Sequence, residues 1–506
     1  MNEGITDMSG DRKTSTLKTD EEDLQIKTKS AAEDLQKKTD AAAVQSEGRK
    51  SEAPKGPVVP DNSGRLFSNK YLLKLLWPLF VEQFLLFAVG LLDSVMVASV
   101  GEAAVSAVSL VDSLMVLLIT VFTAIATGGA VVVGQYLGQK KEENANKAAD
   151  QLFISAFLLS LAIILVMYAL RNQIISLVFG NIEQDVRHYC DVYYLIVMAS
   201  VPFIALYNSG AALMRSVGDS KTSMTVSIIM NIINVVGNAI LIYGLHRGVE
   251  GVAIPTLVSR MTAAAIMIFL LKNSERKVHL TAGTSLKPDW GYIKNIMKIG
   301  IPNGVENGMF QLGKIILLSM ISGFGTVSIA ANAVGNSVST IAVLPGFAMN
   351  YGIVSVVSIC IGAGDYEQVR FYVRKLMKWV YAGMFAMNVI IVLCTPLIIK
   401  IYNLSDTTGS LATKLIFFHS ACAVVIWSAA FVIPYVLRAA GDVTFTMIVG
   451  VASMWIFRIG FAVVIAVYMG MGVMGVWVAM IIDWIVRAIC FCIRYCSGKW
   501  KRGTIA

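Results

Sequence analysis

Two acids interrupt a long apolar stretch near the start of the hydrophobic part of the chain. Glu82 and Asp93 lie within residues 71–99, which otherwise consist mostly of Leu, Val and Phe. Eleven helical steps of about 100° return to within about 20° of the same face, so both carboxylates point to one side of a helix. An unpaired carboxylate near the centre of a bilayer costs at least about 2.5–3.5 kcal/mol. The pattern indicates a helix with a polar side turned to a cavity, where the acids could bind a proton or a cation.

Three asparagines further along the chain share one face of another predicted helix. Asn231, Asn234 and Asn238 lie at spacings i, i+3 and i+7, which places their amides on the same side. These amides could join a hydrogen-bond network with Asp93 or coordinate a cation. The alternative is that they only join neighbouring helices, where each hydrogen bond contributes about 0.6 kcal/mol.

Two aromatic residues inside other apolar runs are candidates for contact with a substrate. The rings of Tyr207 and Trp427 could stack on a planar cation. Most aromatic residues in a membrane protein contact lipid or neighbouring helices instead. We therefore treat Asn231, Tyr207 and Trp427 as possible residues of a substrate cleft.

The second half of the chain repeats the first at a nearly constant spacing. The segment that ends at Glu82 matches the one that ends at Glu306, a shift of 224 residues (306 − 82 = 224). The same shift pairs Gly101 with Gly325, Ala107 with Ala331, Gly138 with Gly362, Glu143 with Glu367, and Gly251 with Gly475. Glu82 and Glu306 could therefore face each other across a cleft, or each could bond to a helix distorted by the preceding proline. Asp93 has no acidic equivalent, because the shifted position is Leu317.

The elements that must position these residues are membrane-spanning helices. The chain has 506 residues, of which 56% are hydrophobic and 15% charged, as is typical of a polytopic membrane protein. Twelve apolar runs are long enough to cross a bilayer: 71–97, 111–137, 150–170, 190–213, 222–244, 250–272, 294–321, 333–362, 372–400, 412–436, 444–469 and 473–496. Each half holds six, so both halves start from the same side of the membrane. We predict an all-α membrane protein with 12 transmembrane helices in two six-helix lobes related by a parallel pseudo-twofold repeat.

Polar segments divide the chain. Residues 1–65 have the composition of a disordered tail. The lobes are residues 66–272 and 293–498, the linker is 273–292, and 499–506 form a basic tail. Basic residues gather in alternate loops, which predicts that both termini are cytoplasmic in a cell membrane. These loops explain the net charge of +9 without nucleic-acid binding, and the scattered cysteines predict no metal or other cofactor.

Other charged residues lie inside the apolar runs of the second half. Asp483 and Arg487 are four residues apart on one helix face and are expected to neutralise each other. Arg458 could find Asp483 or a carboxylate of the cleft. Lys314 lies about 80° around its helix from Glu306, so the two are not expected to pair directly.

Two equivalent arginines lie near predicted cytoplasmic helix ends. Arg215 precedes Asp219 by four residues, and Arg438 precedes Asp442 by the same number. Pairs at this spacing share one face of a helix. We expect each pair to cap a helix end rather than to contact a substrate.

The order of these motifs over residues 70–498 resembles the multidrug and toxic compound extrusion (MATE) family. In the first lobe the resemblance is carried by Pro78-x-x-x-Glu82, Leu92-Asp-Ser-Val-Met-Val97, Gly101-Glu-Ala-Ala-Val-Ser106, Ala126-Thr-Gly-Gly-Ala130, Gln135-Tyr-Leu-Gly138, Arg215-Ser-Val-Gly-Asp219 and Asn231-Ile-Ile-Asn234-Val-Val-Gly-Asn238. In the second lobe it is carried by Ile301-Pro-Asn-Gly-Val-Glu-Asn307, Ala330-Ala-Asn332 and Leu437-Arg-Ala-Ala-Gly-Asp442.

The resemblance implies an antiporter, not an enzyme, in which a proton or Na⁺ runs inward while a small organic, cationic and often aromatic compound leaves. Asp93 falls where the family places a first-helix acid linked to coupling, and Glu306 where several members place a carboxylate for the cation. Asn234 matches a fifth-helix asparagine. Where some members have further acids, this chain has Asn238 and Trp427. The coupling ion stays open between H⁺ and Na⁺, with Na⁺ possible at Asp93 or Glu306, and we expect a monomer in the bilayer.

Other classes stay open as alternatives. A flippase or exporter of a lipid-linked or polysaccharide precursor would need basic residues in its cleft for phosphates, whereas the charges inside the first lobe are acidic. A membrane-embedded enzyme is disfavoured, because no His-rich, Gly-x-Ser-x-Gly or paired Asp motif appears in the spans. A major facilitator transporter would share the twelve spans, but its charged loop signature is not visible in residues 138–143. A fixed channel suits a twofold repeat less well than rocking lobes do.

Overall fold

The first lobe consists of helices that begin at Asn69. The computed structural model describes residues 65–179, 184–281 and 287–501, all within the structural unit Gly56–Ala506. The predicted tail 1–65, apart from Arg65, and residues 502–506 lie outside the described residues. The helices of this lobe are α2 (Asn69–Ala98), α3 (Glu102–Gly138), α4 (Glu142–Ala169), α5 (Arg171–Phe179), α6 (Gln184–Met198), α7 (Val201–Ser216), α8 (Ser220–Ala239) with the π-helical turn η1 (Ile240–Gly244), and α9 (Glu250–Leu271).

The second lobe repeats this layout with more breaks. Its helices are α10 (Trp290–Ser322), α11 (Thr326–Ala342), α12 (Leu344–Gly362), α13 (Tyr366–Ile401), α14 (Asp406–Cys422), η2 (Ala423–Trp427), α15 (Ser428–Phe431), α16 (Ile433–Ala439), α17 (Val443–Ala452), η3 (Ser453–Gly460), η4 (Val463–Tyr468) and α18 (Gly472–Cys496). Pro345 and Pro434 are the second residues of α12 and α16. Proline has no backbone N–H to continue a preceding helix, so each resets the helix at its start.

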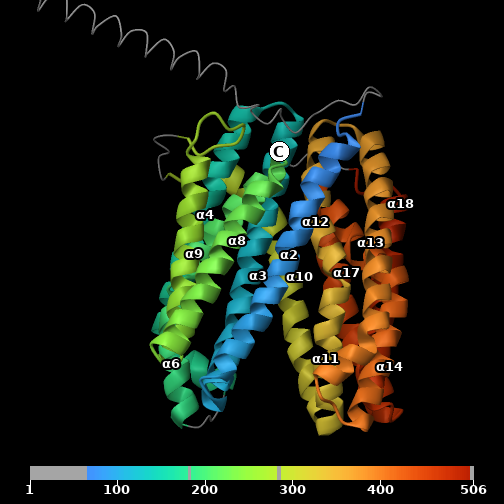
Figure 1. The fold of residues 1–506 in the computed structure, drawn as a ribbon. Coiled ribbons are helices and arrows are strands. Elements are labelled where there is room, and N and C mark those ends of the chain that lie inside the picture. Colours follow the sequence, from blue (N-terminus) through green and yellow to red (C-terminus); the bar gives the residue numbers. More distant parts are fainter. Residues whose placement is uncertain (1–64, 180–183, 282–286, 502–506) are drawn as a thin grey trace, which may run out of the picture. The chain divides into compact units, whose positions relative to one another are not determined.

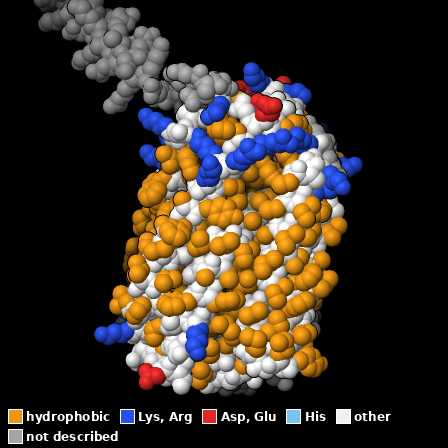
Figure 2. Space-filling model, turned by 90° about the vertical axis from the view of Figure 1, so that its right-hand side faces the viewer, with side chains coloured by type: hydrophobic (Ala, Val, Ile, Leu, Met, Phe, Trp, Pro, Cys, Tyr) orange, Lys and Arg blue, Asp and Glu red, His pale blue; other side chains and the backbone are white. Residues whose placement is uncertain are grey.

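The described helices account for the predicted spans. Ten are long and apolar enough to cross a membrane, or eleven if α6 and α7, bent by 44°, count as one span. The remaining span is α10, which has 33 residues but carries Glu306 and Lys314 in its interior. Apolar side chains cover the outer face in Figure 2, with Lys and Arg more numerous at one end. Phe269 and Leu393 are 77% and 74% exposed, as is expected where lipid replaces water as the solvent.

The lobes meet through α2 and α3 of the first and α10 and α12 of the second (Figure 1). A Cβ atom on Gly128 of α3 would lie 2.5 Å from the carbonyl oxygen of Ile296 and 3.1 Å from the nitrogen of Gly300 on α10. At the equivalent place, a Cβ on Gly352 of α12 would overlap the side chain of Leu76 on α2. The contacts therefore follow the twofold repeat, and glycine lets the helices approach backbone to backbone.

The lobes come into backbone contact at the end of the helices near residue 362. A Cβ on Gly362 would overlap the backbone of Gln135 in the other lobe. At the same end, residues that precede α2 are bound to α13 of the second lobe. Gln368 accepts a hydrogen bond from the Leu66 N–H at 2.8 Å, and the Tyr372 hydroxyl accepts one from the Phe67 N–H at 2.7 Å. The Tyr372 hydroxyl also donates to the Phe67 carbonyl at 3.0 Å.

We expect Gly362→Ala to lower the melting temperature of the purified protein, because the added methyl group collides with backbone that cannot move aside. An Ala in place of Gly within a helix otherwise stabilises by up to about 1 kcal/mol. Gly304→Ala is the matched control, since its Cβ would meet only the Cβ of Ala124 at 3.7 Å. Equal melting temperatures for the two variants in detergent would contradict the close contact between the lobes.

Candidate functional site

A cavity of about 440 Å³ lies in the first lobe. Its walls come mainly from α2, α3, α7, α8 and α9, and residues of α12 and α16 close one side. This volume is within the range of sites for small molecules. The cavity is lined by five of the predicted site residues: Glu82, Asp93, Tyr207, Asn231 and Asn234. The prediction that Glu82 and Asp93 point to one side of their helix is therefore confirmed.

Amide groups from α8 surround the carboxylate of Asp93. The amide of Asn238 donates to it at 2.8 Å. In the orientation that satisfies both its neighbours, the Asn234 amide donates to the two Asp93 oxygens at 3.0 and 3.2 Å and accepts from the Thr256 hydroxyl at 3.1 Å. Of the alternatives left open for the asparagine face, the structure thus shows a hydrogen-bond network with Asp93 for Asn234 and Asn238. The buried amide nitrogen of Asn231 has no hydrogen-bond partner among the described residues. Among the described residues no Lys or Arg forms an ion pair with Asp93.

Two charged residues of this cavity, Asp112 and Arg260, are not among the predicted site residues. The Tyr193 hydroxyl donates to Asp112 at 3.0 Å. Arg260 donates to the Ser200 hydroxyl at 2.7 Å, where α6 meets α7. Both charges lie inside predicted apolar runs, and a charge within a span is in itself a signal of a functional site. That signal was present in the sequence.

Glu82 is neutralised within its own lobe. Its side chain is 3% exposed. Arg215 of α7 lies 3.4 Å from its carboxylate, and the Ser223 hydroxyl of α8 donates to it at 3.1 Å. The Arg215 guanidinium also lies 4.4 Å from the ring centroid of Tyr351 in the second lobe. The glutamate is therefore bound in an ion pair and is not a free charge in the cavity.

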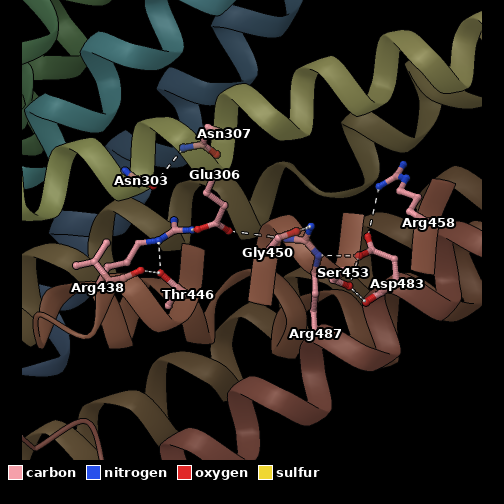
Figure 3. A network of polar contacts seen from close by, with 11 residues as sticks. Asn303, Glu306, Asn307, Arg438, Thr446, Gly450, Ser453, Arg458, Asp483 and Arg487 are labelled. Atoms are coloured by element: carbon pink, nitrogen blue, oxygen red, sulfur yellow. Dashed lines mark hydrogen bonds and ion pairs between the residues drawn. The ribbon is translucent and has the colours of Figure 1, made fainter. Parts of the chain in front are cut away.

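Glu306 has the same surroundings in the second lobe (Figure 3). Arg438 donates to its carboxylate at 2.6 Å and to the Thr446 hydroxyl at 3.4 Å. Arg438 and Thr446 are the repeat equivalents of Arg215 and Ser223 (438 − 215 = 223 and 446 − 223 = 223). The repeat thus extends from the helices to one buried cluster of glutamate, arginine and hydroxyl in each lobe.

These clusters correct the expectation that the two arginines cap helix ends. Arg215 does not pair with Asp219, which instead caps α8 through the Thr222 N–H at 3.2 Å and pairs with Arg276 at 3.1 Å. Asp442 likewise pairs with Arg494 at 2.6 Å, not with Arg438. The arginine side chains instead point into the lobes and form charge-assisted hydrogen bonds or ion pairs with the buried carboxylates of Glu82 and Glu306.

A second cavity, of about 310 Å³, lies in the second lobe. Two predicted site residues, Glu306 and Trp427, line it. The Trp427 ring stacks on Phe431 with centroids 5.0 Å apart and meets Phe347 edge-on at 5.5 Å. Trp427 is therefore both a wall of the cavity and a packing residue.

Arginines and acids alternate beside this second cavity, with Glu306 in its wall and Asp483 behind the wall (Figure 3). Arg487 donates to Asp483 at 2.8 Å, which confirms the predicted pair. Arg487 also lies 3.8 Å from Glu306, and Arg458 lies 3.7 Å from Asp483. The Ser453 hydroxyl donates to Asp483 as well.

The two cavities differ in what their acids can do. Glu82 and Glu306 are held by arginines, whereas Asp93 and Asp112 have only amide or hydroxyl partners among the described residues. Arg260 lines the same cavity and attracts both carboxylates from beyond ion-pair distance. A cation at Asp93 would therefore share the acid with Arg260 but would not have to break a direct ion pair. In the described part of the chain no three His, Cys, Asp or Glu side chains form a metal cluster.

The comparisons with known proteins support a repeated transporter fold. The MatE family model matches residues 78–240 and again residues 302–464. Both ends of the matches differ by the repeat shift (302 − 78 = 224 and 464 − 240 = 224). The transporter YisQ of Bacillus subtilis, which is named as uncharacterized, is 27% identical over 460 residues, which cover 89% of this chain and 97% of YisQ.

A second relative and a solved structure are both named as multidrug resistance proteins. A probable multidrug resistance protein NorM of Thermotoga maritima is 25% identical over 451 residues, covering 86% of this chain and 94% of NorM. A solved outward-facing conformation of a multidrug resistance MATE family transporter of the MOP superfamily is 19% identical, with a TM-score of 0.77, and covers 85% of this chain and 96% of that chain. The chain therefore belongs to the MATE family of multidrug efflux transporters, which are multi-pass membrane proteins and not enzymes.

Proposed function

We propose that the protein exports small organic cations in exchange for H⁺ or Na⁺, with Asp93 as the site where the coupling ion binds. The observation that carries this proposal is the difference between the acids of the two cavities. Asp93 faces the first cavity with amide partners, whereas Glu82 and Glu306 are paired with arginines. A cation at Glu306 would have to displace Arg438 or lie beside it, which makes Asp93 the better ion site.

The groups around Asp93 suit either coupling ion. A proton would neutralise the carboxylate while the amides of Asn234 and Asn238 keep it in place. Na⁺ needs several oxygen ligands, and the buried side-chain oxygen of Asn238 has no hydrogen-bond partner among the described residues. In both cases the bound ion removes the negative charge that holds an organic cation, so the ion and the substrate compete for the cavity.

We propose that transport proceeds by alternating access, in which the two lobes rock against each other. The backbone contacts at Gly128 and Gly362 hold the lobes together toward one end of the helices. Rocking that parts the lobes at this end would bring them together at the other. By the positive-inside rule we place this end and both termini at the cytoplasm of a cell membrane. We propose that a single chain completes the transport path, because both cavities are formed within one chain.

The proposal is tested by reconstituting the full-length protein in liposomes loaded with ethidium. A proton gradient and a Na⁺ gradient are imposed separately, and efflux is followed by fluorescence. We expect one of them to drive efflux against the dye gradient and to lose its effect when an ionophore collapses it. Protein-free liposomes are the control. An efflux rate that is the same with and without either gradient would contradict the proposal.

A further inference from the structure

The second cavity carries an excess of positive charge. Four basic side chains line it: Lys314, Arg438, Arg458 and Arg487. The acids that contact these arginines are Glu306 in the wall and Asp483 behind it. Counted over the described residues, four positive charges face two negative ones. Arg438 and Arg487 are engaged most closely, at 2.6 Å from Glu306 and 2.8 Å from Asp483.

The excess resides on Lys314 and Arg458. Lys314 forms no ion pair among the described residues and lies 5.8 Å from the ring centroid of Phe310. Arg458 lies 5.3 Å from the same centroid, and Arg487 lies 5.4 Å from it, so three cations surround one ring. The Arg458 side chain is 11% exposed, and its nearest acid, Asp483 at 3.7 Å, is already bonded to Arg487. Cations this close repel one another unless an anion lies among them.

Two buried donors of the same cavity have no partner. In the described part of the chain, the Nε–H of Arg458 and the indole N–H of Trp484 form no hydrogen bond. Trp484 is 3% exposed and lines the cavity. A buried donor that stays unpaired costs about 1–3 kcal/mol. An acceptor that enters the cavity would recover this energy, and an anionic acceptor would also offset the excess charge.

The repeat shows that this charge is particular to the second lobe. Counting back takes Lys314 to Gly90 and, with the shift of 223 that pairs Arg438 with Arg215, Arg458 to Val235 (314 − 224 = 90 and 458 − 223 = 235). The two cations of the second cavity thus have uncharged residues at the equivalent places of the first lobe.

We propose that the second cavity binds the anionic group of an organic compound with an aromatic or otherwise apolar body. Lys314 and Arg458 contact the carboxylate, sulfonate or phosphate, and the rings of Phe310, Trp427 and Phe431 contact the body. The cavity volume of about 310 Å³ matches a compound of one or two rings. Tyr435 lines both cavities, so a zwitterion could place its cationic end toward Asp93. As a statement about substrates, this rests on the proposed function.

Equilibrium binding tests the proposal without any ion gradient. Isothermal titration calorimetry of the full-length protein in dodecyl maltoside measures the affinity for naphthalene-2-sulfonate and for the neutral naphthalene-2-sulfonamide. We expect the sulfonate to bind at least ten-fold more tightly. Lys314→Met should weaken sulfonate binding by about 10- to 100-fold, the worth of a charge-assisted hydrogen bond, and Lys314→Arg should restore most of it.

The matched control is Lys298→Met, the same substitution on the same helix outside the cavity; its sulfonate affinity should equal that of the wild type. Equal binding of sulfonate and sulfonamide, or no loss in Lys314→Met at an unchanged melting temperature, would overturn the proposal. Displacement of the sulfonate by lower concentrations of dihexanoyl phosphatidylglycerol would assign the cavity to a lipid head group and overturn it as well. Failure of ion-driven ethidium efflux would contradict the proposed function, but it would not affect the measured preference for the sulfonate over the sulfonamide.

Discussion

Asp93→Asn is expected to reduce gradient-driven efflux of ethidium at least ten-fold. Asparagine has nearly the same shape and can still bond to Asn234 and Asn238, but it can neither take up a proton nor supply a full negative charge for Na⁺. The change therefore removes the coupling chemistry and leaves the packing of α2 against α8 in place. Efflux is measured in liposomes under the gradient that drives the wild type.

A matched variant separates coupling from general damage. Asp406→Asn makes the same substitution at the first residue of α14, outside both main cavities, and should transport like the wild type. The melting temperature of Asp93→Asn in detergent should stay close to that of the wild type. Full-rate efflux by Asp93→Asn would show that the coupling ion binds elsewhere.

Arg438→Met is expected to destabilise the second lobe strongly. Arg438 is 3% and Glu306 6% exposed, and the variant leaves the Glu306 carboxylate buried with only Arg487 nearby, at 3.8 Å. Removing one partner of a buried ion pair costs about 3–5 kcal/mol, so the melting temperature should fall by several degrees. The loss is measured by thermal unfolding of the purified protein.

The double variant Glu306→Gln/Arg438→Met provides the decisive comparison. It removes the unpaired charge along with the cation, so it should be more stable than Arg438→Met alone. Arg494→Met, which breaks the more exposed pair with Asp442, should cost less than Arg438→Met. If the single and double variants melt at the same temperature, the cost does not come from an isolated carboxylate.

Features that depend on local or periodic patterns of residues could be predicted from the sequence. Apolar length predicted the spans, and a constant shift predicted the two lobes, because both are properties of single helices or of the chain as a whole. The spacing of Asn231, Asn234 and Asn238 predicted a shared polar face, and the family resemblance pointed to Asp93. The pair of Asp483 and Arg487 could also be predicted, because residues at i and i+4 of one helix are neighbours.

Pairings between distant helices could not be predicted in this way. Glu82 and Arg215 are 133 residues apart, and their contact depends on how α2 and α7 each pack against α8. Local spacing favoured Asp219 as the partner of Arg215, and the structure shows that choice to be wrong. The convergence of three cations on Phe310 likewise involves α10, η3 and α18, and no single helical pattern contains it.

Leu66 and Phe67 belong to the first lobe by sequence but are fastened to α13 of the second. When the lobes separate at this end, the hydrogen bonds of Leu66 and Phe67 to Gln368 and Tyr372 must either break or restrain the movement of α2. Each such bond is worth about 0.5–1.5 kcal/mol, enough to bias the resting state without preventing turnover. The start of α2 is thereby bonded to the lobe from which it must separate. Each transition that opens this side must therefore supply the free energy of breaking these hydrogen bonds.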